Sequence, residues 1–215
     1  MKVIVFGASG MIGQGVLREC LLDPEVAEVT IVVRKPTGQQ HTKLREIVHE
    51  NFLDFTGVPL DGDACFWCLG VSSNGMTEAD YTRVTHDYTI AAAKVMAKPT
   101  MTFVFVSGAG AEGKAMWARV KKQTEVDLAP LPFKAVYSFR PSIIQPLHGI
   151  RSRTKLYNAF YVVLYPVVLL VKAIAPRSVT TTERVGHAML NIAKRGYEKK
   201  ILANADINDA AKQRT

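Results

Sequence analysis

The chain has few of the features that mark secreted, fibrous or disordered proteins. Three cysteines in 215 residues are too few for a disulfide framework and favour a reducing compartment. The opening residues, MKVIVFG, follow a strand pattern and lack the charged and apolar regions of a secretory signal. Internal repeats, linkers and low-complexity segments are also absent from the sequence. We therefore expect a cytoplasmic protein with one folded domain.

Basic residues outnumber acidic ones, but they do not gather into a cluster. The formal net charge of +8 favours anionic partners such as phosphate groups, acidic lipids or nucleic acid. No run of five basic residues occurs, which argues against a nucleic-acid partner. The expected ligand is therefore a small molecule that carries phosphate.

Apolar runs rich in Val, Ile and Phe alternate with segments of helical length. The expected strands are 2–6, 29–33, 45–50, 64–69, 101–107, 134–140 and 200–203, and the expected helices are 11–22, 78–97, 114–128, 153–175 and 182–194. Continuous apolar strands indicate a parallel sheet buried on both faces, and the alternation with helices predicts a doubly wound, three-layer α/β fold. We expect a Rossmann-type domain over 1–205, with 142–195 on the substrate side and 206–215 as a frayed tail.

A glycine-rich loop follows the first expected strand in VIVFGASGMIGQGVL. Gly7 allows the tight turn, Gly10 lets a pyrophosphate approach the backbone, and Gly13 allows the next helix to pack closely on the strand. The helix N-terminus offers free N–H groups and a positive dipole end to phosphate. Strand, loop, helix and second strand occur in the required order, which predicts a dinucleotide site. Its expected contacts are Gly7, Ser9, Gly10, Met11, Ile12 and Gly13.

The second strand ends in TIVVRKP, where an NAD-specific site usually carries Asp or Glu. This chain has Arg34 there, followed by Lys35, and a cation at that position suits a 2′-phosphate. The expected cofactor is therefore NADP(H). The alternative is that Arg34 is a solvated loop residue.

Asp54 and Phe55, in the NFLDF segment after the third strand, have two interpretations. Asp54 accepts a hydrogen bond from the adenine amino group while Phe55 covers the ring, or the pair is a turn carboxylate and a core aromatic.

The Cys65-x-x-Cys68 spacing in DACFWCLG suggests a redox or metal site, but residues three apart on a strand face opposite sides of the sheet. No second cysteine pair or nearby histidine completes a metal site, so none is expected. We expect both cysteines to be buried as small apolar side chains. The end of this strand, at Cys68, Leu69 and Gly70, is where a cofactor crosses the sheet.

Together these motifs resemble the short-chain dehydrogenase/reductase superfamily, in its atypical branch, and within it the Tat-interactive protein family of oxidoreductase-like proteins. The matching stretches are GASGMIG, CLG, RVTHDY, VSGAGA, WARVK and FRPSII, with a weaker match in TTTERVGHAML. The resemblance covers the chain from Met1 to about Ile150.

The resemblance implies that Ser107 orients a substrate oxygen and that Lys121 binds the nicotinamide ribose. It also implies nicotinamide contacts at Pro141 and Ile143. The tyrosine expected four residues before the lysine is replaced by Trp117, whose indole is no acid near neutral pH. Trp117 would instead line or close the substrate pocket.

Several other side chains could supply the missing acid. His148 has the most suitable ordinary pKa, and Tyr137 is expected near the substrate pocket on the sixth strand. Tyr157 and Tyr161 begin the apolar segment that follows. A lone histidine in a loop is also commonly structural.

The apolar segment 156–175 is almost long enough to span a bilayer, although Pro166 interrupts it. Three interpretations remain open: a helix buried against the sheet and the pocket, a partner or homodimer surface, or an in-plane membrane anchor. The flanking cations that would favour the anchor are Arg151, Arg153, Lys155, Lys172 and Arg177.

The sequence thus predicts an NADP-dependent oxidoreductase, or a relative of epimerase type, acting on a small molecule with a non-standard active site. The alternative is a non-catalytic NADP-sensing protein that regulates a protein or membrane partner.

Overall fold

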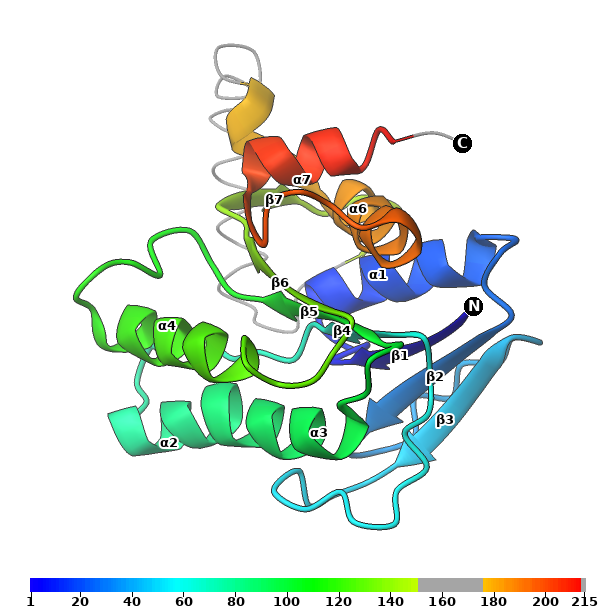
Figure 1. Cartoon of the computed structure of the whole chain (residues 1–215), viewed down its shortest axis with the longest axis horizontal. Coiled ribbons are helices and arrows are strands. Elements are labelled where there is room, and N and C mark those ends of the chain that lie inside the picture. The colour runs from blue at the N-terminus through cyan, green and yellow to red at the C-terminus, as the bar shows by residue number, and fades with distance from the viewer. Residues whose placement is uncertain (151–175, 214–215) are drawn as a thin grey trace.

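The computed structural model describes residues 1–150 and 176–213 (Figure 1). In this part of the chain, seven parallel strands form one sheet in the order β3-β2-β1-β4-β5-β6-β9. The strands are β1 (Lys2–Phe6), β2 (Glu28–Val33), β3 (Leu44–Val48), β4 (Ala64–Trp67), β5 (Thr102–Val106), β6 (Ala135–Arg140) and β9 (Ile201–Ala203). The strand order reverses between β1 and β4, which creates a ligand crevice at the carboxyl ends of these strands. The expected doubly wound fold is confirmed.

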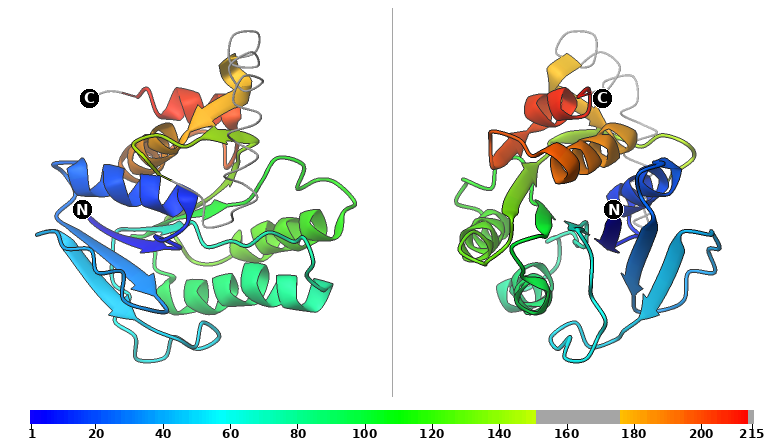
Figure 2. Two further views of the ribbon diagram at one scale, coloured as in Figure 1. Left: turned by 180° about the vertical axis from the view of Figure 1, so that it is seen from behind. Right: turned by 45° about the vertical axis from the view of Figure 1, so that its right-hand side comes forward.

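Helices cover both faces of the sheet and complete the three layers (Figures 1 and 2). One layer contains α1 (Met11–Leu22), α6 (Thr182–Arg195) and α7 (Asn204–Ala210), and the other contains α2 (Glu78–Thr82), α3 (Tyr88–Met96) and α4 (Met116–Leu128). The central strands β1, β2, β4 and β5 are buried on both faces because both helical layers pack apolar side chains against them, whereas the edge strands β3 and β9 are partly exposed.

The two cysteines of the DACFWCLG motif belong to different halves of the core, as the strand geometry predicts. Cys65 is buried in the cluster beneath α3, whereas Cys68 packs against the cluster beneath α1 and α6. Both thiols are free, and burial raises the pKa of each. The structure therefore supports the role of small apolar core residues.

The helix expected over 78–97 contains a change of pitch. A π-helical turn, η1 (Arg83–Asp87), separates α2 from α3 while the chain continues in the same direction. Within it, both ring nitrogens of His86 are engaged by carboxylates. Hydrophobic periodicity does not distinguish this local insertion from a regular helix.

The region 142–195, which was expected on the substrate side, contains elements that the sequence pattern did not reveal. Strands β7 (Ile143–Gln145) and β8 (Val179–Thr181) pair in parallel as a small second sheet, and a 3₁₀ turn, η2 (Pro176–Ser178), precedes β8. Three-residue strands are too short to produce a clear alternation. The apolar segment 156–175, with Tyr157 and Tyr161, lies outside the described residues.

The prediction that 206–215 is frayed is wrong for its first half. Residues 206–210 belong to α7, whose Ile207 and Ala210 are fully buried. These apolar side chains pack into the same core cluster as α6, which fixes the helix. Among the described residues, no helix is both long and apolar enough to cross a bilayer.

Candidate functional site

The glycine loop between β1 and α1 is crowded on its inner side. Gly7 has φ +73°, and a Cβ there would lie 2.5 Å from the backbone nitrogen of Leu69. A Cβ on Gly13 would overlap the carbonyl oxygen of Gly7, and one on Gly10 would lie 3.3 Å from that oxygen. Each glycine therefore has the position that the motif predicts, with the backbone of the loop left accessible.

The N-terminus of α1 begins at this loop without a side-chain cap. Gly10 is the N-cap residue, and no acidic side chain occupies the first turn. The free N–H groups and the positive end of the helix dipole at Met11 and Ile12 therefore remain suited to an anionic ligand. The structure gives the glycine loop the geometry of a phosphate-binding site.

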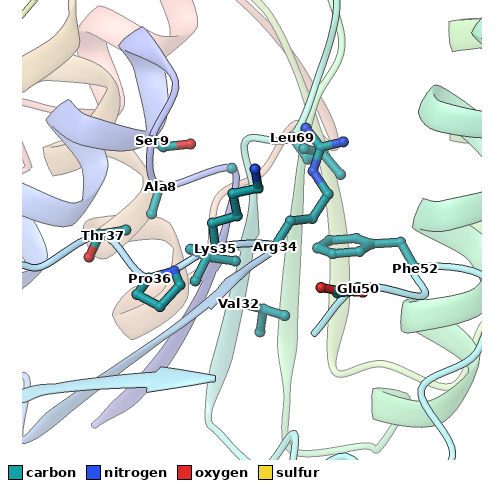
Figure 3. Close-up of a pocket in the computed structure, with 12 residues that line it drawn as sticks. Ala8, Ser9, Val32, Arg34, Lys35, Pro36, Thr37, Glu50, Phe52 and Leu69 are labelled. Carbon is teal, nitrogen blue, oxygen red and sulfur yellow. The ribbon is translucent and has the colours of Figure 1, made fainter. Parts of the chain in front are cut away.

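A pocket of about 750 Å³ opens between the glycine loop and the end of β2. Arg34 and Lys35 both line it, and their side chains extend from the end of β2 into the space between Ser9 and Leu69 (Figure 3). Both cations are exposed. Arg34 is thus placed as the cofactor interpretation requires, at the wall of a pocket that also includes the glycine loop.

The loop that carries these cations is tied to the neighbouring strand. The carboxylate of Glu46 on β3 accepts hydrogen bonds from the backbone N–H and the hydroxyl of Thr37, at 3.0 and 2.6 Å. Because Thr37 also lines the pocket, this contact fixes the wall on the β2 side. Thr37 is not among the residues that the sequence motifs predict for the site.

On the β3 side, the pocket is formed by residues other than those expected. Glu50 and Phe52 line it, whereas Phe55 is 1% exposed and packs edge-on against Phe6 in the core. Asp54 accepts a hydrogen bond from the backbone N–H of Thr56 at 2.9 Å, which lowers the pKa of its carboxyl. The structure favours the alternative for Asp54 and Phe55: a turn carboxylate and a core aromatic.

The expected strand 45–50 ends earlier, at Val48, so Glu50 belongs to the turn at the sheet edge. Glu50 could have been predicted as a ligand contact, because residues that directly follow a strand of a parallel sheet lie at the edge where ligands bind. Leu69 lines the pocket as predicted, whereas half-buried Cys68 and exposed Gly70 do not.

Ser107 and Lys121 are brought together at the end of β5. The Lys121 Nζ, on α4, donates hydrogen bonds to the carbonyl oxygens of Val106 and Ser107, at 3.0 and 2.9 Å. The Ser107 Oγ is buried and has no hydrogen-bond partner among the described residues. A buried hydroxyl without a partner is costly in a finished core, so this group indicates a place where a ligand binds.

The Trp117 ring packs against the loop that follows β5. A Cβ on Gly110 would lie 3.3 Å from Trp117 Cη2, and one on Gly108 would lie 3.8 Å from Trp117 Cζ3 and 4.0 Å from Lys121 Cδ. Trp117 and Lys121 therefore flank the same loop, as residues four apart on a helix do. The half-buried indole forms a wall beside Ser107 and offers no acidic proton.

The loop after β6 is joined to the loop after β5. The backbone N–H of Ala109 donates to the carbonyl oxygen of Pro141 at 2.9 Å, and Ile143 is half-buried on β7. Pro141 thus lies beside the loop that carries Ser107, as the resemblance implies.

Tyr137 is placed differently from the expectation. Its hydroxyl accepts from the N–H of Tyr197 at 3.0 Å and donates to the carbonyl of Tyr197 at 3.2 Å, and the Lys200 Nζ lies 4.3 Å from its ring centroid. Tyr197 and Lys200 belong to the connection between α6 and β9, which lies at the amino ends of the parallel strands. Tyr137, which was expected in the substrate pocket, is thus engaged with Tyr197 near the amino edge of the sheet, at the opposite end of the strands from the loop that follows Ser107.

His148 is directed to the helical layer of α1 and α6. Its Nε2 lies 2.6 Å from Glu183 Oε2, in the first turn of α6, and this contact lowers the pKa of Glu183. The carboxylate of Glu19 lies close by, since the ligand atoms of these three residues are within 4.8 Å of one another. The φ of His148, +56°, belongs to the left-handed region. This placement pairs His148 with carboxylates and not with Ser107 or Lys121.

The comparison with known proteins agrees with this geometry. No family model matches the chain. In sequence, it is 27% identical over 151 residues to Protein HTATIP2 of Rattus norvegicus, and the match covers 66% of this chain and 62% of that protein. The chain thus spans less than two thirds of the length of this relative.

Solved structures share the fold. An oxidoreductase of the short-chain dehydrogenase/reductase family from Burkholderia thailandensis has a TM-score of 0.68 at 13% identity, over 97% of this chain and 92% of that one. A short chain dehydrogenase from Burkholderia cenocepacia, in complex with NADP, has a TM-score of 0.60 at 14% identity, over 94% and 86%. In sequence and fold, the chain resembles the atypical short-chain dehydrogenases/reductases, and among them the Tat-interactive protein.

Proposed function

We propose that this protein binds NADP(H) at the switch point of the sheet and reduces a small carbonyl compound. The observation that carries the proposal is the pocket that Arg34 and Lys35 line together with residues 7–9, the first part of the glycine loop (Figure 3). A phosphate-binding loop and two cations in one pocket match a dinucleotide that has a phosphate on its ribose.

The residues present fit such a cofactor. The close approach of Gly7 and Gly13 leaves the backbone of the loop open to a pyrophosphate, and the uncapped N-terminus of α1 favours its charge. Arg34 has the planar, bidentate donor geometry that suits a 2′-phosphate. Glu50, the acidic residue of the pocket lining, lies beside Phe52 on the β3 side (Figure 3).

Ser107 and Lys121 would form the reaction centre. When bound, NADPH would supply a hydride to the carbonyl carbon of a substrate. The Ser107 hydroxyl, which lacks a protein partner among the described residues, would donate a hydrogen bond to the substrate oxygen. Trp117 would form an apolar wall beside that oxygen and exclude water from it.

The experiment that tests cofactor binding is a fluorescence titration of the protein with NADPH and with NADH. We expect tighter binding of NADPH, and Arg34→Ala should weaken it by about 10- to 100-fold, the value of one charge-assisted hydrogen bond. NADH affinity should change little, because NADH has no 2′-phosphate.

Arg45→Ala is the matched control. Arg45 is an exposed cation on β3, outside the pocket lining, so its removal alters the net charge equally and leaves the site intact. Equal affinities for NADPH and NADH, both insensitive to Arg34→Ala, would reject the 2′-phosphate role. Binding of neither nucleotide would reject the proposed function.

A second candidate function is favoured by Trp117. The resemblance implies a tyrosine at position 117, whose phenol would serve as the acid. This chain has Trp117 there, and its indole cannot donate a proton near neutral pH. On this candidate, the protein binds NADP(H) without turnover and acts as a sensor. It would be supported if NADPH binds but is not oxidised in the presence of any compound in a broad carbonyl panel.

A further inference from the structure

The missing proton donor has a replacement in the same helix. We propose that the Lys121 ammonium group donates the proton to the substrate oxygen, in the role that a phenol would otherwise have. This inference rests on the proposed function, because the proton is needed only if hydride reaches a carbonyl carbon. It assigns Lys121 a catalytic role beyond holding a ribose.

The contacts of Lys121 place its amino group at the reaction centre. A lysine ammonium has three N–H donors. Two of those of Lys121 donate to the carbonyl oxygens of Val106 and Ser107, at 3.0 and 2.9 Å. Val106 is the last residue of β5 and Ser107 follows it directly, so both carbonyls lie at the carboxyl edge of the sheet, where ligands bind in such folds. The third N–H has no acceptor among the described residues and could donate to a substrate.

Ser107 supplies the second half of the site. Its backbone carbonyl holds Lys121, while its buried Oγ has no partner among the described residues. A substrate oxygen that accepts from the Ser107 hydroxyl therefore lies next to the residue to which the ammonium is bound. One oxygen atom can then receive both donors, which is the arrangement that stabilises a developing alkoxide.

The surroundings make this ammonium group unusually acidic. Burial lowers the pKa of Lys121 to about 8, and the charge of Glu125, one turn further along α4, acts in the opposite direction. Glu125 is itself paired with Arg140 from β6, which limits its effect on Lys121. Unperturbed tyrosine has a pKa of about 10, so this lysine is the stronger acid and is closer to the ideal value for catalysis near neutral pH.

The other charges around α4 are paired with different partners. Arg119 bonds Glu78 of α2, and Asp127 bonds His86 of η1, both at the helical layer. On the sheet side, the Lys121 Nζ lies 5.5 Å from the centroid of the Phe105 ring, an apolar neighbour that contributes to its burial. Glu125 is therefore the carboxylate whose charge acts on Lys121.

The step balances without a further reactant. Hydride transfer would convert the carbonyl π pair into an oxygen lone pair, and the new alkoxide would take a proton from the ammonium. An alcohol and a neutral Lys121 amine result, and the amine regains its proton from water. Among the described residues, Trp117 has no acidic proton, Tyr137 is bound to Tyr197, and His148 is bound to Glu183.

The first test measures the proton on Lys121 directly, without cofactor. The ligand-free protein is labelled with ¹³C,¹⁵N-lysine, and its side-chain signals are followed by NMR between pH 6 and 11. The signal of Lys121 is assigned by its loss in Lys121→Arg. A midpoint near 8 is expected; a midpoint at the ordinary lysine value of about 10.4 would overturn the proposal.

The second test compares turnover and binding in the same variants. Wild type should oxidise NADPH with at least one carbonyl of the panel, and its rate should fall as pH rises through about 8, because the protonated lysine is lost. Lys121→Arg should retain most of the NADPH affinity but lose turnover by about 10²–10⁴-fold, since a guanidinium does not release a proton in this range. Adding Trp117→Tyr to Lys121→Arg should restore part of the rate.

The outcomes separate the acid from a lysine that only binds ribose. Unchanged turnover in Lys121→Arg overturns the acid role, and so does a wild type that binds NADPH without turnover while Trp117→Tyr alone is active. If wild type does not bind NADPH, the proposed function fails and the acid role fails with it. An ordinary lysine midpoint with intact NADPH binding rejects the acid role alone.

Discussion

The Nε2 of His86 lies 2.8 Å from Oδ2 of Asp127, so a single imidazole connects the π-helical turn η1 to α4. The other ring nitrogen, Nδ1, lies 2.8 Å from Oδ1 of Asp87. Since α4 also carries Lys121 and Trp117, this link helps to hold the helix of the reaction centre in place.

The first prediction concerns the pH dependence of this link. Burial opposes the charged form of His86, but the hydrogen bonds and charges of Asp87 and Asp127 outweigh burial and raise its pKa. Its stabilisation is therefore complete below the unfolded value of about 6.5 and is lost as pH rises through the higher folded value. His86→Gln should lower the free energy of unfolding by about 1 kcal/mol at pH 6 and by less at pH 9, measured by urea denaturation.

Asp127→Asn provides the control for this prediction. In that background, the effect of His86→Gln should depend less on pH than in wild type, because one of the two carboxylates that favour the charged ring is missing and only Asp87 remains. An effect of His86→Gln that is the same at both pH values in the wild-type background would show that the link does not depend on a charged imidazole.

The second prediction compares two glycines with the same backbone angle. Gly7 and Gly38 both have φ +73°, but a Cβ on Gly38 has no atom within 4 Å, whereas one on Gly7 meets the backbone of Leu69 at 2.5 Å. Gly38→Ala should cost about 1–2 kcal/mol of stability for the left-handed conformation alone. Gly7→Ala should cost at least twice as much, because the ends of β1 and β4 must separate.

Urea denaturation of the two variants measures the difference. Similar losses would mean that the loop adjusts without strain and that the close approach of Gly7 to Leu69 is not essential for the fold.

The third prediction tests the position of Tyr137. Tyr137→Phe removes the acceptor of the Tyr197 N–H and should lower the free energy of unfolding by about 1–3 kcal/mol. NADPH affinity and turnover should be unchanged, because the hydroxyl lies at the amino edge of the sheet. The measurements are urea denaturation, the NADPH titration and the rate of NADPH oxidation. Normal stability with reduced turnover would contradict this prediction and indicate that Tyr137 contacts the substrate.

The fold and the pocket beside the glycine loop could be predicted because their signals are local. The glycines directly follow β1 and Arg34 directly follows β2, so each signal is read from a short stretch of sequence, and the structure places Gly7, Ser9 and Arg34 in one pocket. The short strands β7 and β8 left no comparable pattern.

The positions of the donor candidates could not be predicted, because each depends on contacts between distant segments. Tyr137 meets Tyr197 sixty residues later, and His148 meets Glu183 thirty-five residues later. Phe52 and Phe55 are the same residue type three positions apart, and the sequence does not show that Phe52 lines the pocket while Phe55 packs in the core. The spacing of four residues from Trp117 pointed to Lys121, but nothing in the sequence indicated that its amino group would be buried against the end of β5.

Asn204, the first residue of α7, joins the end of the chain to the substrate side. Its side-chain oxygen accepts from the N–H of Ser142 at 3.0 Å, and its amide nitrogen donates to the Ser142 hydroxyl at 2.9 Å and to the carbonyl of Ser178 at 2.5 Å. The loop after β6 is thus held in place by Asn204, which is translated some sixty residues later. During synthesis, the loop after β6 lacks these contacts until Asn204 has left the ribosome, so a chain arrested before Asn204 would have the glycine loop but not the hydrogen bonds that hold Ser142.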